Sequence, residues 1–297
     1  MASIQAKIVN RYLRNTMKKL PLGEMEPTKI REVFEKRVIP FLPKSVDRSP
    51  VEGPVRGEWQ RPVNANKGRT VLFCHGGGYV FGSPRTHRSM SYPLAVAAAA
   101  DVFSLDYRLA PEYPCPAQIE DAVAAFDMLV SEGRDPSSIW IAGDSAGGGL
   151  ALSTAIALRD RGDTQAAGVV AYSPWTDMTC SGASLSENVE SDVMFQVSSI
   201  FAGAERYLGG LKPDDPRASP LFADLAGLPP TLIFASNAEV LRDDGIRFAE
   251  RARAAGVDVE LIVEEGLAHV WPLFNPIMPE AKKSIGQSAA FIERTAP

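Results

Sequence analysis

Short apolar segments alternate with amphipathic segments along most of the chain. The apolar segments cover residues 70–74, 102–105, 138–142, 168–172, 231–235 and 259–263. The amphipathic segments have apolar positions at helical spacing and cover residues 118–130, 146–161 and 243–255. Strands that are apolar throughout are buried on both faces, and strands separated by helices are typical of parallel pairing. The pattern therefore predicts an α/β fold with a central, mostly parallel sheet flanked by helices.

Three stretches depart from this alternation. Residues 4–17 predict a basic amphipathic helix, which either packs on the rest of the protein, as we expect, or lies on a membrane. A second short helix is predicted for residues 29–37, before an extended segment punctuated by Pro40, Pro43, Pro50, Pro54 and Pro62. Residues 176–230 form a long interruption, in which residues 191–208 have helical spacing. Long interruptions in compact domains are usually functional, so we predict that this one forms a lid together with the N-terminal helices.

Composition and charge narrow the class of protein. The 297 residues are 45% hydrophobic and 23% charged, which is typical of a globular protein, and no window is apolar enough to predict a membrane span. The net charge of −5 disfavours nucleic acid as a partner. Cys74, Cys115 and Cys180 are far apart, so we expect neither a zinc site nor a disulfide framework. Free thiols and the lack of a signal-peptide pattern predict a cytoplasmic protein.

One serine lies in a sequence pattern that is typical of an activated nucleophile. The segment Gly143-Asp-Ser145-Ala-Gly147 fits G-x-S-x-G, between a predicted strand and a predicted helix. In that context the serine lies on a sharp turn, and the flanking glycines allow the strand and the helix to approach closely. The alternative interpretation is a plain glycine-rich turn, which the strand–turn–helix context disfavours.

A second glycine motif follows the first core strand. In the segment from His75 to Gly78, three glycines allow backbone N–H groups to approach a substrate, as in the HGGG oxyanion loops of lipases and esterases. We assign the oxyanion hole to the N–H groups of Gly77, Gly78 and Ala146, and we expect His75 and Gly76 to support the loop. The alternative is a flexible turn with a structural histidine.

The sequence offers few candidates for a catalytic base. Its three histidines are His75, His87 and His269. His269 follows the last predicted strand, where catalytic groups gather in α/β sheets, so we predict that it is the base. We expect His87 to lie at the surface. Candidates for the acid follow the strand at residues 231–235: Glu239 lies nearest the strand end, whereas Asp243 and Asp244 could instead cap the next helix.

In these motifs the chain resembles the bacterial hormone-sensitive-lipase-like esterases of the α/β-hydrolase superfamily. The matching segments appear in the family's order: His75-Gly-Gly-Gly-Tyr79, Asp106-Tyr-Arg-Leu-Ala-Pro-Glu112, Gly143-Asp-Ser-Ala-Gly-Gly148, Ser173-Pro-Trp175 and His269-Val-Trp271. The resemblance implies an α/β-hydrolase fold, a Ser–His–acid triad and activity on short-chain acyl esters without a cofactor or metal. It also implies a helical cap, with its N-terminal part at residues 1–45 and an insertion at about 180–215 in a catalytic domain of residues 46–297.

The chain departs from the family at the triad acid. Where the family usually has Asp-Pro-Leu, this sequence has Glu239-Val-Leu241. Position in the motif assigns the role to Glu239, with Asp243 as the alternative.

The sequence thus predicts a carboxylesterase in which Ser145 forms an acyl-enzyme, His269 is the base and Glu239 orients it. We expect short acyl chains because the insertion is small and the lid shows no long exposed apolar stripe. The substrate pocket could be lined by Tyr79, Met194, Phe195, Tyr207 and Phe222, although these residues could equally pack within the lid. Alternatives on the same fold are a non-catalytic receptor for a small ligand and an amidase or peptidase. A small-molecule ester is the expected partner, and a homodimer is one assembly that the sequence allows.

Overall fold

An eight-stranded sheet runs through the part of the chain that the computed structural model describes, which is residues 2–36, 45–66, 68–162 and 165–297. The strand order is β1-β2-β4-β3-β5-β6-β7-β8. The first two strands form an antiparallel hairpin, β2 is antiparallel to β4, and the remaining pairs are parallel. The strands are β1 (Val46–Val51), β2 (Gly57–Pro62), β3 (Thr70–Cys74), β4 (Asp101–Leu105), β5 (Ile139–Asp144), β6 (Gly168–Tyr172), β7 (Thr231–Ser236) and β8 (Val259–Glu264).

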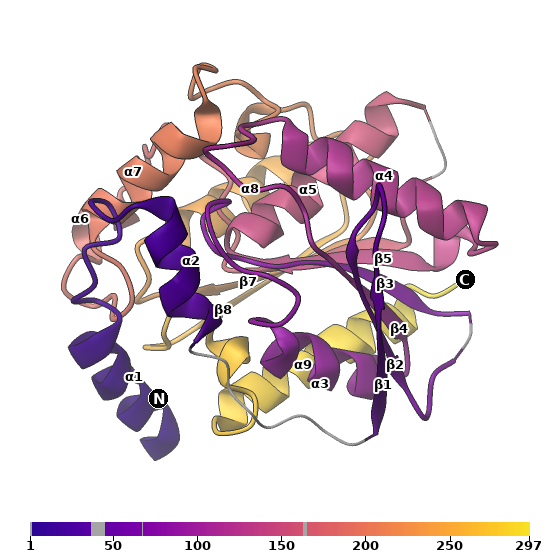
Figure 1. Cartoon of the computed structure of the whole chain (residues 1–297), viewed down its shortest axis with the longest axis horizontal. Helices are drawn as coiled ribbons and strands as arrows, with labels where there is room; N and C mark the ends of the chain where they lie inside the picture. Colours follow the sequence, from indigo (N-terminus) through magenta and orange to yellow (C-terminus); the bar gives the residue numbers. More distant parts are fainter. Residues whose placement is uncertain (1, 37–44, 67, 163–164) are drawn as a thin grey trace.

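Helices cover both faces of the sheet (Figure 1). Helices α4, α5 and α8 lie on one face, and α3 and α9 lie on the other. The α-helices of the described residues are α1 (Ile4–Thr16), α2 (Pro27–Glu35), α3 (Arg88–Ala98), α4 (Ala117–Ser131), α5 (Ala146–Asp160), α6 (Ser184–Glu187), α7 (Val197–Leu208), α8 (Arg242–Ala254) and α9 (Pro279–Arg294). Short 3-10 helices are η1 (Pro136–Ser138), η2 (Pro220–Phe222) and η3 (Trp271–Phe274).

The central strands are buried on both faces because their side chains alternate between two apolar cores. In β3, Leu72 and Cys74 belong to the core beneath α4 and α5, whereas Val71 and Phe73 belong to the core beneath α3 and α9. This two-sided burial is the reason that the parallel strands are apolar without interruption. It also aligns the carboxyl ends of the strands at one edge, where the following loops meet.

Helices α1, α2 and α7, which we call the covering helices, gather at one end of the molecule (Figure 1). They are joined by hydrogen bonds: Arg206 of α7 donates to the carbonyl oxygens of Leu22, Gly23 and Met25, between α1 and α2. Apolar side chains of α1, including Val9 and Leu13, pack into the protein, as the sequence predicted. Within the described ranges, no helix has the length and apolar character needed to cross a bilayer.

The predicted α/β fold and every predicted core strand are confirmed, with bounds that differ by one or two residues. The proline-rich extended segment contains the hairpin of β1 and β2, with Pro50 in an edge strand, which tolerates proline. The second predicted helix corresponds to α2, while Arg37, Pro40 and Pro43 lie outside the described residues.

One predicted helix begins later than expected, and some helices were missed. The helix expected at residues 191–208 begins only at Val197, because the Asp192 carboxylate accepts hydrogen bonds from the backbone N–H groups of Met194 and Phe195 and turns the chain. Helices α3, α6 and α9 were not predicted from the sequence.

Candidate active site

Ser145 lies on a strained turn between β5 and α5. Its φ of 54° and ψ of −122° fall outside the regions that residues with a Cβ usually occupy. Gly143 and Gly147 make this turn possible. A Cβ on Gly147 would lie 2.1 Å from the Cys74 carbonyl oxygen, and one on Gly143 would lie 2.2 Å from the Gly147 carbonyl oxygen. The pattern G-x-S-x-G therefore has the close strand–helix approach that the sequence analysis predicted.

The glycine loop after β3 lies next to this turn. Gly77 and Gly78 have φ of 120° and 59°, which is the left-handed region that favours glycine. The N–H groups of Gly77, Gly78 and Ala146 have no acceptor in the described parts of the chain, although both segments are buried or half-buried. The loop and the first turn of α5 thus offer free donors beside Ser145.

His75 is held in place at the start of this loop by contacts with Tyr107 and Gly76. Its ring stacks on Tyr107 at 4.2 Å between centroids, and its Nδ1 lies 2.8 Å from the Gly76 carbonyl oxygen. Burial lowers the pKa of His75 to about 3, so the ring is neutral at ordinary pH. A buried neutral ring of this kind suits packing rather than proton transfer.

His269 and Glu239 meet at the carboxyl ends of β8 and β7. The His269 Nδ1 lies 2.5 Å from the Glu239 Oε2, and both side chains are almost completely buried. The other carboxylate oxygen, Oε1, accepts a hydrogen bond from the Ser236 N–H at 2.7 Å, which fixes the carboxylate. The His269 Nε2 is buried and has no hydrogen-bond partner among the described residues. One ring nitrogen is therefore anchored while the other is available.

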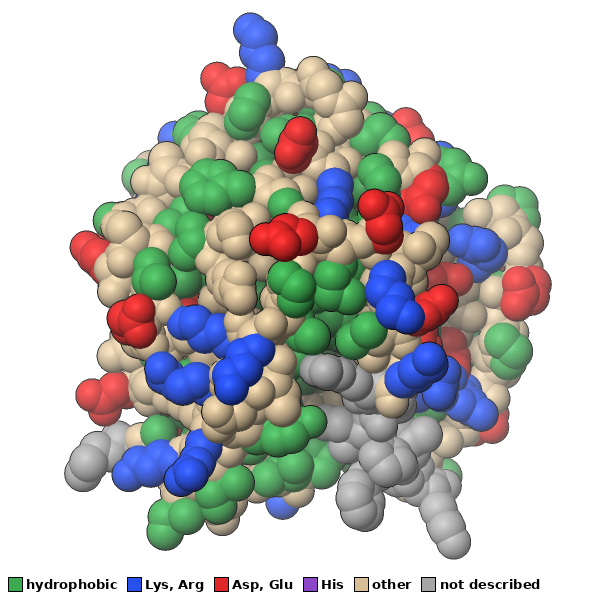
Figure 2. Space-filling model, turned by 60° about the vertical axis from the view of Figure 1, so that its left-hand side comes forward, with side chains coloured by type: hydrophobic (Ala, Val, Ile, Leu, Met, Phe, Trp, Pro, Cys, Tyr) green, Lys and Arg blue, Asp and Glu red, His purple; other side chains and the backbone are tan. Residues whose placement is uncertain are grey.

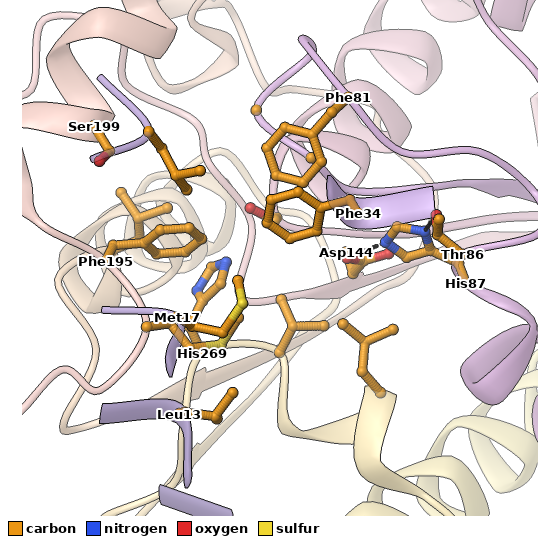
Figure 3. A pocket seen from close by; sticks show the side chains of 18 of the residues that line it. Leu13, Met17, Phe34, Phe81, Thr86, His87, Asp144, Phe195, Ser199 and His269 are labelled. Atoms are coloured by element: carbon orange, nitrogen blue, oxygen red, sulfur yellow. Dashed lines mark hydrogen bonds and ion pairs between the residues drawn. The ribbon is translucent and has the colours of Figure 1, made fainter. Parts of the chain in front are cut away.

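The charge of Glu239 controls the protonation of His269. Burial alone lowers the pKa of His269, but the hydrogen bond to Glu239 and the negative charge of that carboxylate outweigh it, so the pKa lies above its usual value. The Phe195 ring meets the imidazole edge to face, at 5.1 Å between centroids, and shields it from solvent (Figure 3).

The competing acidic residues lie elsewhere. The Asp243 carboxylate accepts a hydrogen bond from the Ser184 N–H and pairs with Arg242. The Asp244 carboxylate accepts hydrogen bonds from the Thr176 and Asp177 N–H groups, and burial raises its pKa to about 8. Both lie in the first turn of α8, and neither contacts His269.

Ser145 and His269 open into one apolar cavity of about 500 Å³. A cavity of this size suits a small organic ligand. Its lining comes from the glycine loop, the covering helices and η3, and it includes Leu13, Met17, Phe34, Phe81, Trp175, Phe195 and Leu273. Figure 3 shows His269 and Phe195 on one side of this cavity, and the stacked rings of Phe34 and Phe81 on another.

The predicted pocket residues divide into two groups. Met194 and Phe195 line the cavity. Tyr79 and Tyr207 do not: they stack on each other at 3.6 Å between centroids and are fully buried. Phe222 packs against the core on the α5 face. For these three residues the pocket assignment is wrong, because they belong to or pack against the core on the α4 and α5 side of the sheet.

Two further expectations are wrong. His87 is only 6% exposed; its ring lies beside Asp144, and both line the cavity (Figure 3). The covering helices also carry an exposed apolar stripe, because Ile4, Ile8 and Tyr12 of α1 are each more than half exposed. On the face turned forward in Figure 2, such hydrophobic side chains reach the surface between Lys and Arg side chains.

The described residues contain no group of three or more His, Cys, Asp or Glu side chains arranged to hold a metal ion. The site is instead built from side chains and backbone donors of the chain itself.

Comparison with known proteins agrees with this geometry. Residues 71–273 match the family described as "alpha/beta hydrolase fold". An acetyl-hydrolase of Streptomyces hygroscopicus is 42% identical over 92% of this chain and 91% of its own length. A carboxylesterase of Mycobacterium tuberculosis, NlhH, is 37% identical over 81% of this chain and 78% of its own.

Solved structures agree over the whole chain. A crystal structure of an esterase from the bacterial hormone-sensitive lipase family has a TM-score of 0.95 and 39% identity over 100% of both chains. The chain belongs to the hormone-sensitive-lipase-like esterases of the α/β-hydrolase superfamily. Crystals of another similar esterase, EstE5, were soaked with p-nitrophenyl butyrate, and that structure has a TM-score of 0.95 and 38% identity over 99% of both chains. The present chain is therefore a serine ester hydrolase.

Two glycine-to-alanine substitutions within helices, one beside the turn at Ser145 and one far from it, should have opposite effects on stability. Gly147→Ala should lower the free energy of unfolding by about 1–3 kcal/mol and reduce ester hydrolysis, since the new Cβ would collide with the backbone of β3. Gly286→Ala in α9 has open space around the new Cβ, and it should raise stability by up to about 1 kcal/mol. Denaturant unfolding and ester turnover of both variants would test this. Equal stability of the two variants would contradict the close approach at the turn.

Proposed function

We propose that this carboxylesterase hydrolyses short-chain acyl esters through a triad of Ser145, His269 and Glu239. The observation that carries the proposal is the anchored imidazole, with Nδ1 bonded to Glu239 and Nε2 unpaired at the cavity that Ser145 shares. A neutral imidazole with a free Nε2 is the group that can accept the serine proton. Contact between the Ser145 hydroxyl and Nε2 forms as the substrate binds, since catalytic hydrogen bonds often tighten only then.

The first half of the reaction forms an acyl-enzyme. The Ser145 Oγ attacks the ester carbonyl while His269 Nε2 takes the hydroxyl proton. Negative charge then develops on the former carbonyl oxygen, and the free N–H groups of Gly77, Gly78 and Ala146 stabilise it. His269 returns the proton to the leaving alcohol. Throughout, the ionised Glu239 fixes the ring and stabilises its positive charge.

The second half releases the acid. A water molecule loses a proton to His269 and attacks the acyl carbonyl, passing through a second oxyanion in the same N–H cradle. The proton then returns to Ser145 as the acyl bond breaks. The steps just described need no electron transfer, because each one moves only a proton and an acyl group.

The preference for short acyl chains is supported by the covering helices and by relatives. Side chains of α1, α2 and α7 line the cavity beside Ser145, and the cavity is in the volume range of small ligands. One similar protein is named an acetyl-hydrolase, and crystals of another were soaked with a butyrate ester. The exposed stripe of Ile4, Ile8 and Tyr12 removes one sequence argument for this preference, so it rests on the volume of the cavity and on these relatives.

The proposal also includes the domain bounds, the partner and the cellular location that the sequence predicts. Residues 1–45 and about 180–215 form the helical cap, and residues 46–297 otherwise form the catalytic domain. The partner is a small-molecule ester rather than nucleic acid, and a homodimer is one possible assembly. The free thiols of Cys74, Cys115 and Cys180 support a cytoplasmic location.

Replacement of the nucleophile tests the function directly. Ser145→Ala should lower the kcat for p-nitrophenyl butyrate by about 10⁴- to 10⁶-fold, because no acyl-enzyme can form. Ser153→Ala removes a buried hydroxyl from α5, the helix that follows Ser145, outside the cavity, and should change kcat little. A fluorophosphonate probe should label the wild-type protein and not the Ser145 variant. Absence of labelling would favour a non-catalytic receptor instead.

A series of acyl-chain lengths tests the substrate class. The kcat/KM for p-nitrophenyl esters should be highest for short acyl groups and fall steeply beyond hexanoate, since longer chains must displace side chains of the covering helices. The matching anilides should react far more slowly, which separates an esterase from an amidase. Highest activity on long-chain triglycerides would refute the short-chain proposal.

The pH dependence of hydrolysis tests the role of Glu239. Because the neutral form of His269 is the base and its pKa is raised, kcat/KM should fall as the pH drops through a value above about 6.5. Glu239→Gln removes the charge that raises this pKa while burial still lowers it, so the acidic limb should move to lower pH. The maximal kcat should drop on the order of 10³- to 10⁴-fold. Asp243→Asn should leave the limb in place, and a limb that moves with Asp243 instead would reassign the acid.

A further inference from the structure

His87 is a second buried histidine at the site, and the triad does not use it. It directly precedes α3, and its ring lies between the glycine loop and the residue before the nucleophile. The His87 Nε2 is 3.3 Å from the Asp144 Oδ2, and the other oxygen, Oδ1, accepts a hydrogen bond from the Gly76 N–H at 3.1 Å. Figure 3 shows this group on the side of the cavity away from His269.

The contacts of the Nδ1 atom indicate that it carries a proton. It lies 2.8 Å from the Thr86 Oγ1 and 3.4 Å from the Ser83 carbonyl oxygen. The Thr86 hydroxyl donates its own hydrogen to that same carbonyl, at 2.9 Å. When the Thr86 hydrogen lies on the Ser83 carbonyl, the hydroxyl oxygen accepts from the ring, and the carbonyl itself can only accept.

The contacts of the Nε2 atom indicate a second proton. Its neighbour Asp144 is a carboxylate, and a ring nitrogen without a hydrogen would face it with a lone pair. The Gly76 N–H points to both Nε2, at 3.2 Å, and the Asp144 Oδ1, at 3.1 Å, so it donates to the carboxylate alone when Nε2 carries a hydrogen. With hydrogens on both nitrogens, Nδ1 donates to Thr86 or Ser83 and Nε2 donates to Asp144, while the Gly76 N–H remains on the Asp144 Oδ1.

The position of Asp144 makes this charge consequential for catalysis. A Cβ on Gly76 would lie 2.2 Å from the Asp144 Oδ2, so the carboxylate sits directly against the oxyanion loop. Asp144 also precedes Ser145 and is almost fully buried. An unbalanced negative charge here would oppose the negative charge that develops on the substrate oxygen.

We propose that His87 is a positioning residue for the oxyanion hole, held as an imidazolium that neutralises Asp144 and keeps its carboxylate on the Gly76 N–H. The inference rests on the proposed esterase mechanism and extends it. His87 does not touch the reacting atoms; it acts through Asp144 and the loop. Ester turnover thus depends on two histidines with opposite requirements, since His269 must be neutral to act as a base while His87 must be charged.

The surrounding groups are consistent with a charged ring. Asp144 faces it from β5, His75 from the end of β3, and Glu35 from α2. Burial lowers the pKa of His87, and the charge and hydrogen bond of Asp144 more than offset it, so the pKa is raised. His75 adds no competing charge because it is neutral. Glu35 pairs with Arg85 and accepts a hydrogen bond from the Ser83 hydroxyl.

Removing one or both charges of the His87–Asp144 pair distinguishes the effect of charge neutralisation from the effect of packing. His87→Gln should lower kcat for p-nitrophenyl butyrate by about 10- to 100-fold with little change in KM, because the buried Asp144 charge is left unbalanced. The double variant His87→Gln/Asp144→Asn removes both charges, and it should recover at least about tenfold of that loss. The wild-type kcat should also fall at alkaline pH as His87 loses its proton, and the double variant should lack that fall. A double variant as slow as His87→Gln would overturn the proposal.

A matched control and a wild-type measurement complete the test. Arg134→Gln breaks a largely but less deeply buried ion pair with Asp101 at the opposite end of the strands, and it should lower stability without changing kcat. If the His87 variants do not fold, ¹⁵N-histidine spectra of the wild-type protein decide the question, because only three rings must be assigned. The ring next to the Thr86 methyl group should carry protons on both nitrogens at pH 7. A neutral ring there would overturn the inference while leaving wild-type esterase activity, and hence the proposed function, intact.

Discussion

The buried hydrogen bond between Glu239 and His269 is the interaction on which the site depends. It joins the loops after β7 and β8, 30 residues apart in the chain, and it determines which imidazole nitrogen faces the cavity. A buried carboxylate needs fixed partners, and the Ser236 N–H provides one on the other oxygen. The sheet makes the meeting possible, because parallel strands bring their following loops to one edge. Without this pair, the strained turn at Ser145 would present a hydroxyl with no base.

The two sides of the cavity handle charge in opposite ways. On one side, the carboxylate of Glu239 holds His269, which the proposed mechanism requires to alternate between neutral and charged forms. On the other side, the carboxylate of Asp144 lies against the oxyanion loop, with His87 beside it. Free backbone donors at Gly77, Gly78 and Ala146 lie between them. Because the cavity lining is mostly apolar, these few charges act with little screening by water.

Local sequence signals predicted the parts of the fold that local physics determines. Uninterrupted apolar strands, the glycines around Ser145 and the HGGG loop were all identifiable, since each residue type is required by its own backbone or its burial. Helix α3 was missed because it contains Pro93 and is buried on several sides, so it lacks an amphipathic period. In α9, Ser284 and Ser288 lie on the buried face, with their hydroxyls bonded to carbonyls of the same helix, and they weaken the apolar pattern.

Roles that depend on tertiary contacts were harder to predict. Buried His87 pairs with Asp144, which lies 57 positions further along the chain. No sequence pattern near His87 indicates that pairing. Tyr79 and Tyr207 carry the large aromatic rings expected of a pocket, yet they stack on each other within the core. The choice between Glu239 and Asp243 likewise needed the geometry, because both follow β7 closely in sequence. Sequence therefore located the site, while only the packed structure distinguished its members.

The most direct test of the central claim is a crystal structure of the protein after reaction with a phosphonate ester. The account predicts phosphorus bonded to the Ser145 Oγ, with a phosphonyl oxygen about 3 Å from the N–H groups of Gly77, Gly78 and Ala146. It also predicts His269 Nε2 within hydrogen-bond distance of the Ser145 Oγ or the leaving-group position, with Nδ1 still on Glu239. A phosphonate on another residue, or an imidazole turned away from the adduct, would contradict it.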